Sequence, residues 1–175
     1  PLLDGNGRIG RLLITVCLMM MGDMRQPNLY LSLFFKNNRE EYYARLSAVR
    51  TAGDWEGWLD YFLHGVAETA NQVVATSQAI SSLFKVDQEK IATLKRAGIT
   101  AGQAHERLQK VAISNAINMA AALEVSVPTA RAALNNLKEL GVVKDISGAG
   151  KERLYVYTGL IDLLEQGVAT DNLQA

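Results

Sequence analysis

Residues 4–11, close to the start of the chain, combine the residue types that proteins use to hold phosphate groups. They read Asp-Gly-Asn-Gly-Arg-Ile-Gly-Arg, and an apolar stretch with helical spacing follows at once. Glycines let backbone N–H groups face an anion without an intervening Cβ, and a helix N-terminus adds unpaired N–H donors and the positive end of the helix dipole. This pattern predicts a polyphosphate site whose backbone part comprises Gly5, Asn6 and Gly7.

Three charged side chains complete the predicted phosphate site. Arg8 and Arg11 are three residues apart, so on a helix they leave the same face and converge on one anion. Asp4 suits a hard cation such as magnesium, which bridges phosphate oxygens. A simpler interpretation stays open, in which Asp4 caps the helix, the glycines form a turn and the arginines pair with surface carboxylates such as Glu40 or Glu41. The run is neither a Walker loop nor a dinucleotide fingerprint, because no Lys-Ser/Thr pair follows the glycines and no strand precedes them.

Residues 1–11 resemble the signature of the Fic-domain family, H-P-F-x-D/E-G-N-G-R-x-x-R, from its second position onward. Leu2 stands where the family has Phe, and the histidine of the signature would precede Pro1. Residues 27–59 are also similar to bacterial Fic proteins that carry a C-terminal winged helix. The resemblance therefore extends over essentially the whole chain.

The resemblance implies a protein adenylyltransferase, which transfers AMP from ATP to a hydroxyl of an unidentified target protein and releases pyrophosphate. By family analogy Asp4 holds magnesium, and Arg8 neutralises the phosphates of the leaving group with Asn6 beside it as a second catalytic residue. Arg11 would meet the γ-phosphate, or an inhibitory glutamate in the inactive state. The phosphate-binding residues that the analogy assigns are Gly5, Asn6, Gly7, Arg8 and Arg11. Fic proteins also remove AMP or transfer other phosphate-containing groups, so the reaction itself stays open.

The same analogy implies that the chain is a fragment that begins just after the catalytic histidine. That histidine is the general base that deprotonates the attacking hydroxyl. We therefore expect full activity only of the complete parent protein, and no AMP transfer at an enzymatic rate from residues 1–175 alone.

The spacing of apolar residues predicts a mainly α protein. Prolines occur only at positions 1, 27 and 128, and strand-like alternation is confined to the C-terminal part. A glycine-containing stretch at 96–104 divides the expected C-terminal part of a Fic domain with a long helical connector, 1–98, from a second domain, 99–175. The expected helices of the first part are a buried helix Gly7–Met21, Leu29–Phe35, Asn38–Arg50, and one or two long helices between Trp55 and about Ala97.

Residues 99–175 show the order of a winged-helix domain. Two short helical stretches between Gln103 and Leu123 precede a helix at Pro128–Leu140, for which Ser126 is the expected N-cap. A β-hairpin follows, formed by 142–146 and 154–157 around a glycine-containing turn. Winged helices often place their third helix in the major groove of DNA. The side chains expected to contact DNA from that helix are Thr129, Arg131, Asn135, Asn136 and Lys138, with wing contacts from Lys144, Lys151 and Arg153.

Charge argues for weak DNA binding. Residues 126–157 carry five basic and three acidic side chains, and residues 99–175 carry seven and eight. Because phosphate contacts dominate DNA affinity, binding would be weak unless a homodimer doubles the contacts. The winged-helix order of elements leaves one alternative to an adenylyltransferase. It is a DNA-binding or partner-docking winged-helix regulator whose Fic site senses a nucleotide.

Composition excludes several other classes of protein. The 175 residues are 49% apolar and balance 18 basic against 18 acidic side chains, which excludes nucleic-acid or membrane binding through bulk charge. Cys17 is the only cysteine, and the longest apolar run, Leu12–Met21, is about half of a membrane span. His64 and His105 have no neighbouring ligand at metal-binding spacing. We expect a cytoplasmic protein that does not enter the membrane.

Overall fold

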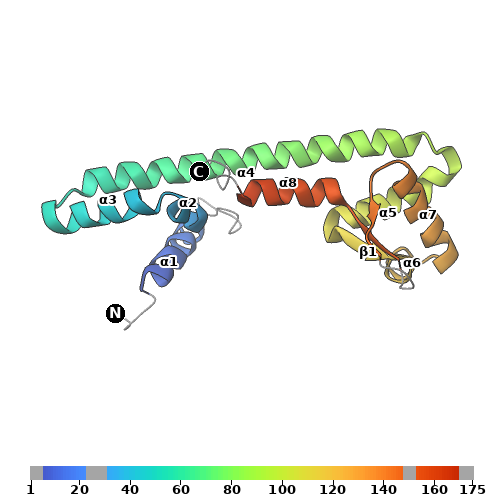
Figure 1. Cartoon of the computed structure of the whole chain (residues 1–175), viewed down its shortest axis with the longest axis horizontal. Helices are drawn as coiled ribbons and strands as arrows, with labels where there is room; N and C mark the ends of the chain where they lie inside the picture. The colour runs from blue at the N-terminus through green and yellow to red at the C-terminus, as the bar shows by residue number, and fades with distance from the viewer. Residues whose placement is uncertain (1–5, 23–30, 148–152, 170–175) are drawn as a thin grey trace. The chain divides into compact units, whose positions relative to one another are not determined.

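The computed structural model describes residues 6–22, 31–147 and 153–169, and it confirms the predicted mainly α class (Figure 1). These ranges contain eight α-helices and one small antiparallel sheet of three strands. The chain forms two compact units, residues 1–75 with 167–175 and residues 76–166.

Helices α1 (Asn6–Met20), α2 (Leu31–Asn37) and α3 (Arg39–Ala52) lie in the N-terminal unit, which also holds the first part of α4 (Trp55–Ala92). The stretch expected to hold one or two long helices is thus a single α-helix as far as Ala92. Gly53 ends α3 in the left-handed conformation, with φ 71°. The N–H of Gly57 donates to Asp54 Oδ1 at 3.0 Å, so Asp54 caps α4.

The core of the N-terminal unit is small and aromatic. Phe34 and Phe35 of α2 meet Tyr61 of α4, and Trp58 and Tyr42 pack around them. The close packing of α2 on α4 depends on a glycine, because a Cβ at position 65 would collide with the Phe34 ring. This cluster fixes α2, α3 and the start of α4 against one another.

Helix α1 differs from the buried helix that its composition predicts. Ile14 packs against the aromatic cluster, whereas Leu12, Leu13, Val16 and Met20 are exposed among the described residues. An apolar stretch in a sequence indicates that its side chains favour burial. It does not show which other part of the molecule covers them. The prediction of burial is wrong for the side chains of α1 that the structure describes, and the helical assignment is right.

The C-terminal unit has the element order of a winged helix, as predicted. After the end of α4 and a short 3-10 turn at Lys95–Ala97 come α5 (Gly98–Val111), β1 (Ile113–Asn115), α6 (Ala116–Leu123), α7 (Val127–Glu139), β2 (Lys144–Asp145), β3 (Leu154–Val156) and α8 (Thr158–Ala169). The strands pair antiparallel in the order β1-β3-β2. Tyr155 of β3 lies opposite Ser114 on one side and Asp145 on the other.

Strand β1, like helix α8, is an element that the sequence analysis did not predict. Ala112 ends α5 with φ 55°, and Ile113 then pairs with Val156. Three residues are too few to show an alternating pattern, so only the pairing with distant β3 reveals them as a strand. The two helical stretches expected between Gln103 and Leu123 are otherwise present as α5 and α6.

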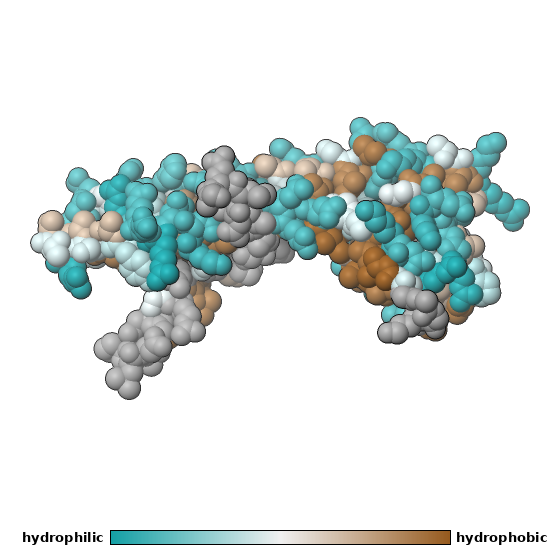
Figure 2. Space-filling model, viewed as in Figure 1, coloured by the Kyte–Doolittle hydropathy of each residue, from teal (hydrophilic) through white to brown (hydrophobic). Residues whose placement is uncertain are grey.

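The core of the C-terminal unit joins all of its helices. It contains Leu108 of α5, Met119 of α6, Leu134 of α7 and Leu160 of α8, together with Ile91 near the end of α4. Figure 2 shows apolar residues gathered over this unit, while hydrophilic residues cover most of α3 and the neighbouring part of α4. Helix α7 and the hairpin therefore pack on one continuous apolar core.

A buried polar chain crosses this core. The hydroxyl of Tyr157 donates to Asp87 Oδ2 at 2.7 Å, so His105 Nε2, 3.1 Å away, donates to the hydroxyl oxygen. Asp87 Oδ1 also accepts from Lys90 Nζ at 2.7 Å. Burial lowers the pKa of His105, because it disfavours the charged form of the ring. These bonds tie α4, α5 and the end of β3 together.

Candidate functional sites

The predicted phosphate site coincides with the beginning of α1. Asp4 and Gly5 lie outside the described residues, and so do the side chains of Asn6, Arg8 and Arg11. The backbone of α1 begins at Asn6, so Arg8 and Arg11 lie in its first turns with the spacing that the sequence predicts. The first turn of α1 contains no acidic residue, so its own side chains do not neutralise the positive end of its dipole.

One carboxylate named in the simpler interpretation already has a partner. Glu41 Oε1 accepts from Arg45 Nη2 at 3.0 Å, one helical turn along α3. Such an exposed pair adds little to stability, and it does not require an arginine of α1. The anion-binding interpretation of the N-terminal run therefore stays open beside the structural one.

The five predicted DNA-contact side chains all belong to α7, but the structure gives them different surroundings. Thr129 is part of the N-cap, because its N–H and its hydroxyl both contact Ser126 Oγ, at 3.3 and 2.8 Å. Arg131 is exposed and has no ion pair among the described residues. Asn136 is half-buried. The helix therefore presents Arg131 as a free cation within the part of the chain that is described.

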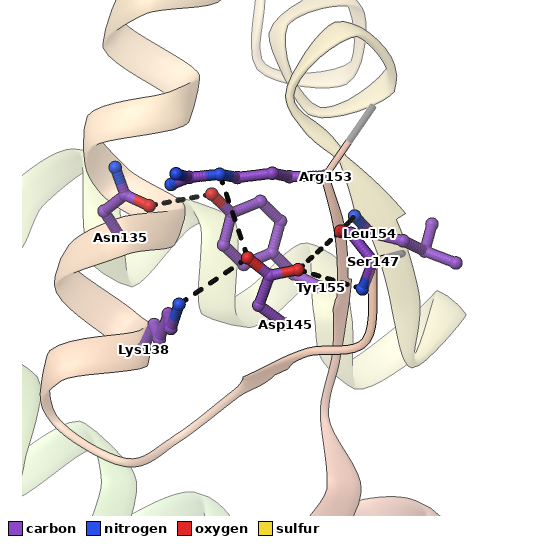
Figure 3. A network of polar contacts seen from close by, with 7 residues as sticks. All are labelled: Asn135, Lys138, Asp145, Ser147, Arg153, Leu154 and Tyr155. Carbon is purple, nitrogen blue, oxygen red and sulfur yellow. Dashed lines mark hydrogen bonds and ion pairs between the residues drawn. The ribbon is translucent and has the colours of Figure 1, made fainter. Parts of the chain in front are cut away.

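Asn135 and Lys138 contact the hairpin that follows α7 (Figure 3). The hydroxyl of Tyr155 donates to Asn135 Oδ1 at 2.7 Å, which leaves the amide NH₂ group directed away from Tyr155. Lys138 Nζ lies 3.5 Å from Asp145 Oδ2. Both side chains are thus positioned by β2 and β3 rather than free in solvent.

Asp145 is at the centre of this network, and the sequence analysis did not name it. Its Oδ1 accepts from the N–H of Ser147 at 3.1 Å and from the Ser147 hydroxyl, while Oδ2 faces Lys138 and, at 3.8 Å, Arg153 Nε. The hydroxyl of Ser147, followed by its N–H and the Lys138 cation, lowers the pKa of Asp145. The signal available in the sequence was the Asp-x-Ser pattern at the end of a strand, which is typical of a turn closed by the aspartate side chain.

A separate cleft of about 470 Å³ lies on α5, β1 and α6, away from the described side chains of α7. It combines exposed Arg107 with apolar side chains and the hydroxyl of Ser114. None of its lining residues belongs to α7 or to the hairpin. The residues that line it are Arg107, Val111, Ile113, Ser114, Asn118, Ala121 and Ala122.

The described residues contain neither a metal-binding cluster nor a membrane-spanning helix. Within residues 6–22, 31–147 and 153–169, no three His, Cys, Asp or Glu side chains gather as a metal site would require, and the proposed magnesium ligand Asp4 is not in these ranges. His64 contacts Glu68 one turn along α4, and His105 belongs to the buried polar chain. Over the same ranges, none of the helices has the length and apolarity needed to cross a membrane.

The chain was also compared with models of known protein families. No family model matches it.

Proposed function

We propose that this chain is the nucleotide-binding part of a magnesium- and ATP-dependent protein adenylyltransferase. The observation that carries the proposal is the run at residues 4–11, which continues directly into α1 from Asn6. It supplies glycines, an amide, two arginines and a carboxylate within eight positions. Phosphoryl transfer depends mainly on positioning and charge stabilisation, and these residue types provide both.

Six residues of the run then have a role in holding ATP. The N–H groups of Gly5, Asn6 and Gly7 bind the α- and β-phosphates, and Arg8 offsets the negative charge that develops on the leaving pyrophosphate. Arg11, one turn further along α1, binds the terminal phosphate. Asp4 offers the kind of carboxylate that holds magnesium beside nucleotide phosphates, and the ion supplies further charge neutralisation when bound.

Binding of ATP tests the phosphate site in this chain. We expect Arg8→Ala to weaken binding of Mg-ATP by about tenfold or more, since it removes a bidentate charged contact. Arg50→Ala is the matched control, because Arg50 is exposed on α3 and has no ion pair in the described part of the chain. Isothermal titration calorimetry of the three proteins measures the difference. Equal affinities for the wild type and Arg8→Ala would remove Arg8 from the site.

Transfer of AMP is tested on the full gene product. Incubation with ATP and magnesium should add one AMP to the protein or its target, measured by intact-mass spectrometry, and Arg8→Ala should abolish the gain. Mass gain by the Arg8→Ala protein would contradict the proposed role of this arginine.

DNA binding by the C-terminal unit is a second candidate function. It is favoured by α7, which exposes Arg131 without an ion pair among the described residues, and by the exposed cations Lys138, Lys144 and Arg153 of the same unit. We expect weak binding that falls as salt is raised, because phosphate contacts would dominate it. Arg131→Ala should lower the affinity for a fluorescein-labelled duplex in an anisotropy titration. Lys85→Ala, which removes an exposed cation from α4, should not.

A further inference from the structure

Three polar side chains form a stripe on the accessible side of α7. Arg131, Asn135 and Lys138 follow the i, i+4, i+7 spacing that places residues on one face of a helix. The adjacent stripe, Ala130, Leu134 and Leu137, is buried in the core. The first stripe therefore runs along the surface and ends where Lys138 meets the hairpin.

At that end, two cations from different elements converge on one carboxylate oxygen. Lys138 Nζ of α7 and Arg153 Nε beside β3 lie 3.5 and 3.8 Å from Asp145 Oδ2 (Figure 3). Their side chains are 47% and 56% exposed, whereas that of Asp145 is 16% exposed. The carboxylate thus lies beneath the two cations, and their outer N–H groups remain available to a second anion.

The donors left over at this point suit a phosphodiester. An ammonium group carries three N–H donors and a guanidinium group five, so one carboxylate oxygen at these distances leaves most of them unused. Figure 3 shows the Arg153 guanidinium extending toward Asn135, whose NH₂ group adds a neutral donor. A backbone phosphate has two free oxygens and one negative charge, and nucleic-acid backbones are bound by such mixed sets of donors.

We propose that Lys138 and Arg153 form a contact pair for a nucleic-acid backbone phosphate, and that Asp145 limits how strongly this pair binds it. The inference rests on the DNA-binding function proposed for α7. A phosphate placed on the outer side of the two cations lies close to the Asp145 carboxylate, and like charges at this range repel each other. Asp145 also offsets one of the two positive charges before any ligand arrives.

The Asp145→Asn substitution tests the effect of the negative charge of Asp145 on DNA binding. Asparagine has nearly the same shape, and its Oδ1 still accepts from the N–H and hydroxyl of Ser147, so the contacts that Ser147 makes with position 145 and Leu154 are preserved. We expect Asp145→Asn to bind a fluorescein-labelled DNA duplex about three- to tenfold more tightly at low salt. The plot of log affinity against log salt should steepen by about one, since one more cation becomes available to displace counterions.

Two other variants localise the effect. Asp162→Asn removes the same charge from an exposed position on α8 and should change affinity little. Lys138→Gln should weaken DNA binding. In the double variant Lys138→Gln/Asp145→Asn, most of the affinity gained through Asp145→Asn should be lost, because the effects of substitutions at neighbouring residues are not additive. Unchanged thermal unfolding of each variant shows that the hairpin is intact.

The outcomes separate this inference from the function on which it rests. Tighter binding by Asp145→Asn alone supports the phosphate pair. Binding by the wild type that is weakened by Arg131→Ala, but is unchanged or weaker in Asp145→Asn, overturns the role of Asp145 and retains DNA binding. An equal gain from Asp162→Asn also overturns it, because net charge would then suffice. Absence of binding by the wild type and by Asp145→Asn overturns DNA binding and the inference together.

Discussion

The two units differ in how completely the described residues cover their helices. In the C-terminal unit, one apolar core takes side chains from α4, α5, α6, α7, β3 and α8. In the N-terminal unit the fully buried residues come from α2 and α4, and α1 contributes the partly buried Ile14. The proposed DNA surface is therefore carried by a helix with a buried face, whereas the proposed phosphate run continues into a helix whose described apolar side chains are mostly exposed.

These two candidate surfaces obtain their geometry from different sources. Contacts with α5, α6 and the hairpin fix α7 in place, and its polar side chains also contact residues of β2 and β3. The run at 4–11 owes its expected geometry to local backbone effects, namely glycine freedom and the start of a helix. Substitutions of apolar residues should consequently lower the free energy of unfolding much more in the core of the C-terminal unit than in α1.

A matched pair of leucines gives the largest expected difference. Leu134 is 0% exposed in α7 and Leu12 is 63% exposed in α1. Leu134→Ala should lower the free energy of unfolding by about 2–5 kcal/mol, because it removes buried surface and leaves a cavity. Leu12→Ala should change it by less than about 0.5 kcal/mol. Guanidinium unfolding followed by circular dichroism measures both, and similar losses would show that α1 is covered as completely as α7.

The buried polar chain provides the next test. Tyr157→Phe keeps the aromatic ring but removes the hydroxyl shared by Asp87 and His105. Loss of a donor to a buried carboxylate should lower the free energy of unfolding by about 1–3 kcal/mol. Tyr43→Phe removes a hydroxyl from an exposed ring of α3 and should cost little. A negligible effect of Tyr157→Phe would mean that the C-terminal unit does not depend on this connection.

His105 should make the stability of the C-terminal unit depend on pH. Burial lowers its pKa in the folded state, so its contribution is complete above the unfolded value of about 6.5 and is lost as the pH falls below that value. The slope contributed by this one group cannot exceed about 1.4 kcal/mol per pH unit.

Unfolding curves between pH 7.5 and 5.5, for the wild type and His105→Gln, measure this slope. His105→Gln should flatten it. A slope that persists in His105→Gln would assign the pH dependence to other groups.

Local signals in the sequence predicted much of the fold. Ser126 is an N-cap as expected, and the hairpin follows α7. These features depend on neighbouring residues, so one sequence suffices to place them. The long helix α4 and the order of α5, α6, α7 and the hairpin follow from the same spacing rules.

Features that depend on distant residues were not predictable in the same way. Strand β1 exists because Ile113 pairs with Val156, and Asp145 acquires its importance because Lys138 and Arg153 meet it in space. The exposure of α1 likewise depends on what lies against it, which composition does not specify. The chemical character of the 4–11 run was readable from residue types alone, whereas the surroundings of α7 required the structure.

The smallest predicted effect concerns the cap of α6, which begins one residue after β1. Asn115 Oδ1 accepts from the N–H of Asn118 at 2.7 Å, and Asn115 also forms the last position of β1 opposite Leu154. Asn115→Ala should lower the free energy of unfolding by about 1 kcal/mol, because a helix N–H loses its acceptor. Asn118→Ala is the matched control, since it keeps the backbone donor and places a better helix former in the same turn.

A larger loss from Asn118→Ala than from Asn115→Ala would show that the side chain of Asn118, on the wall of the α5–β1–α6 cleft, matters more than the cap. A loss confined to Asn115→Ala would show that short-range capping supplements the core even where α6 is well covered.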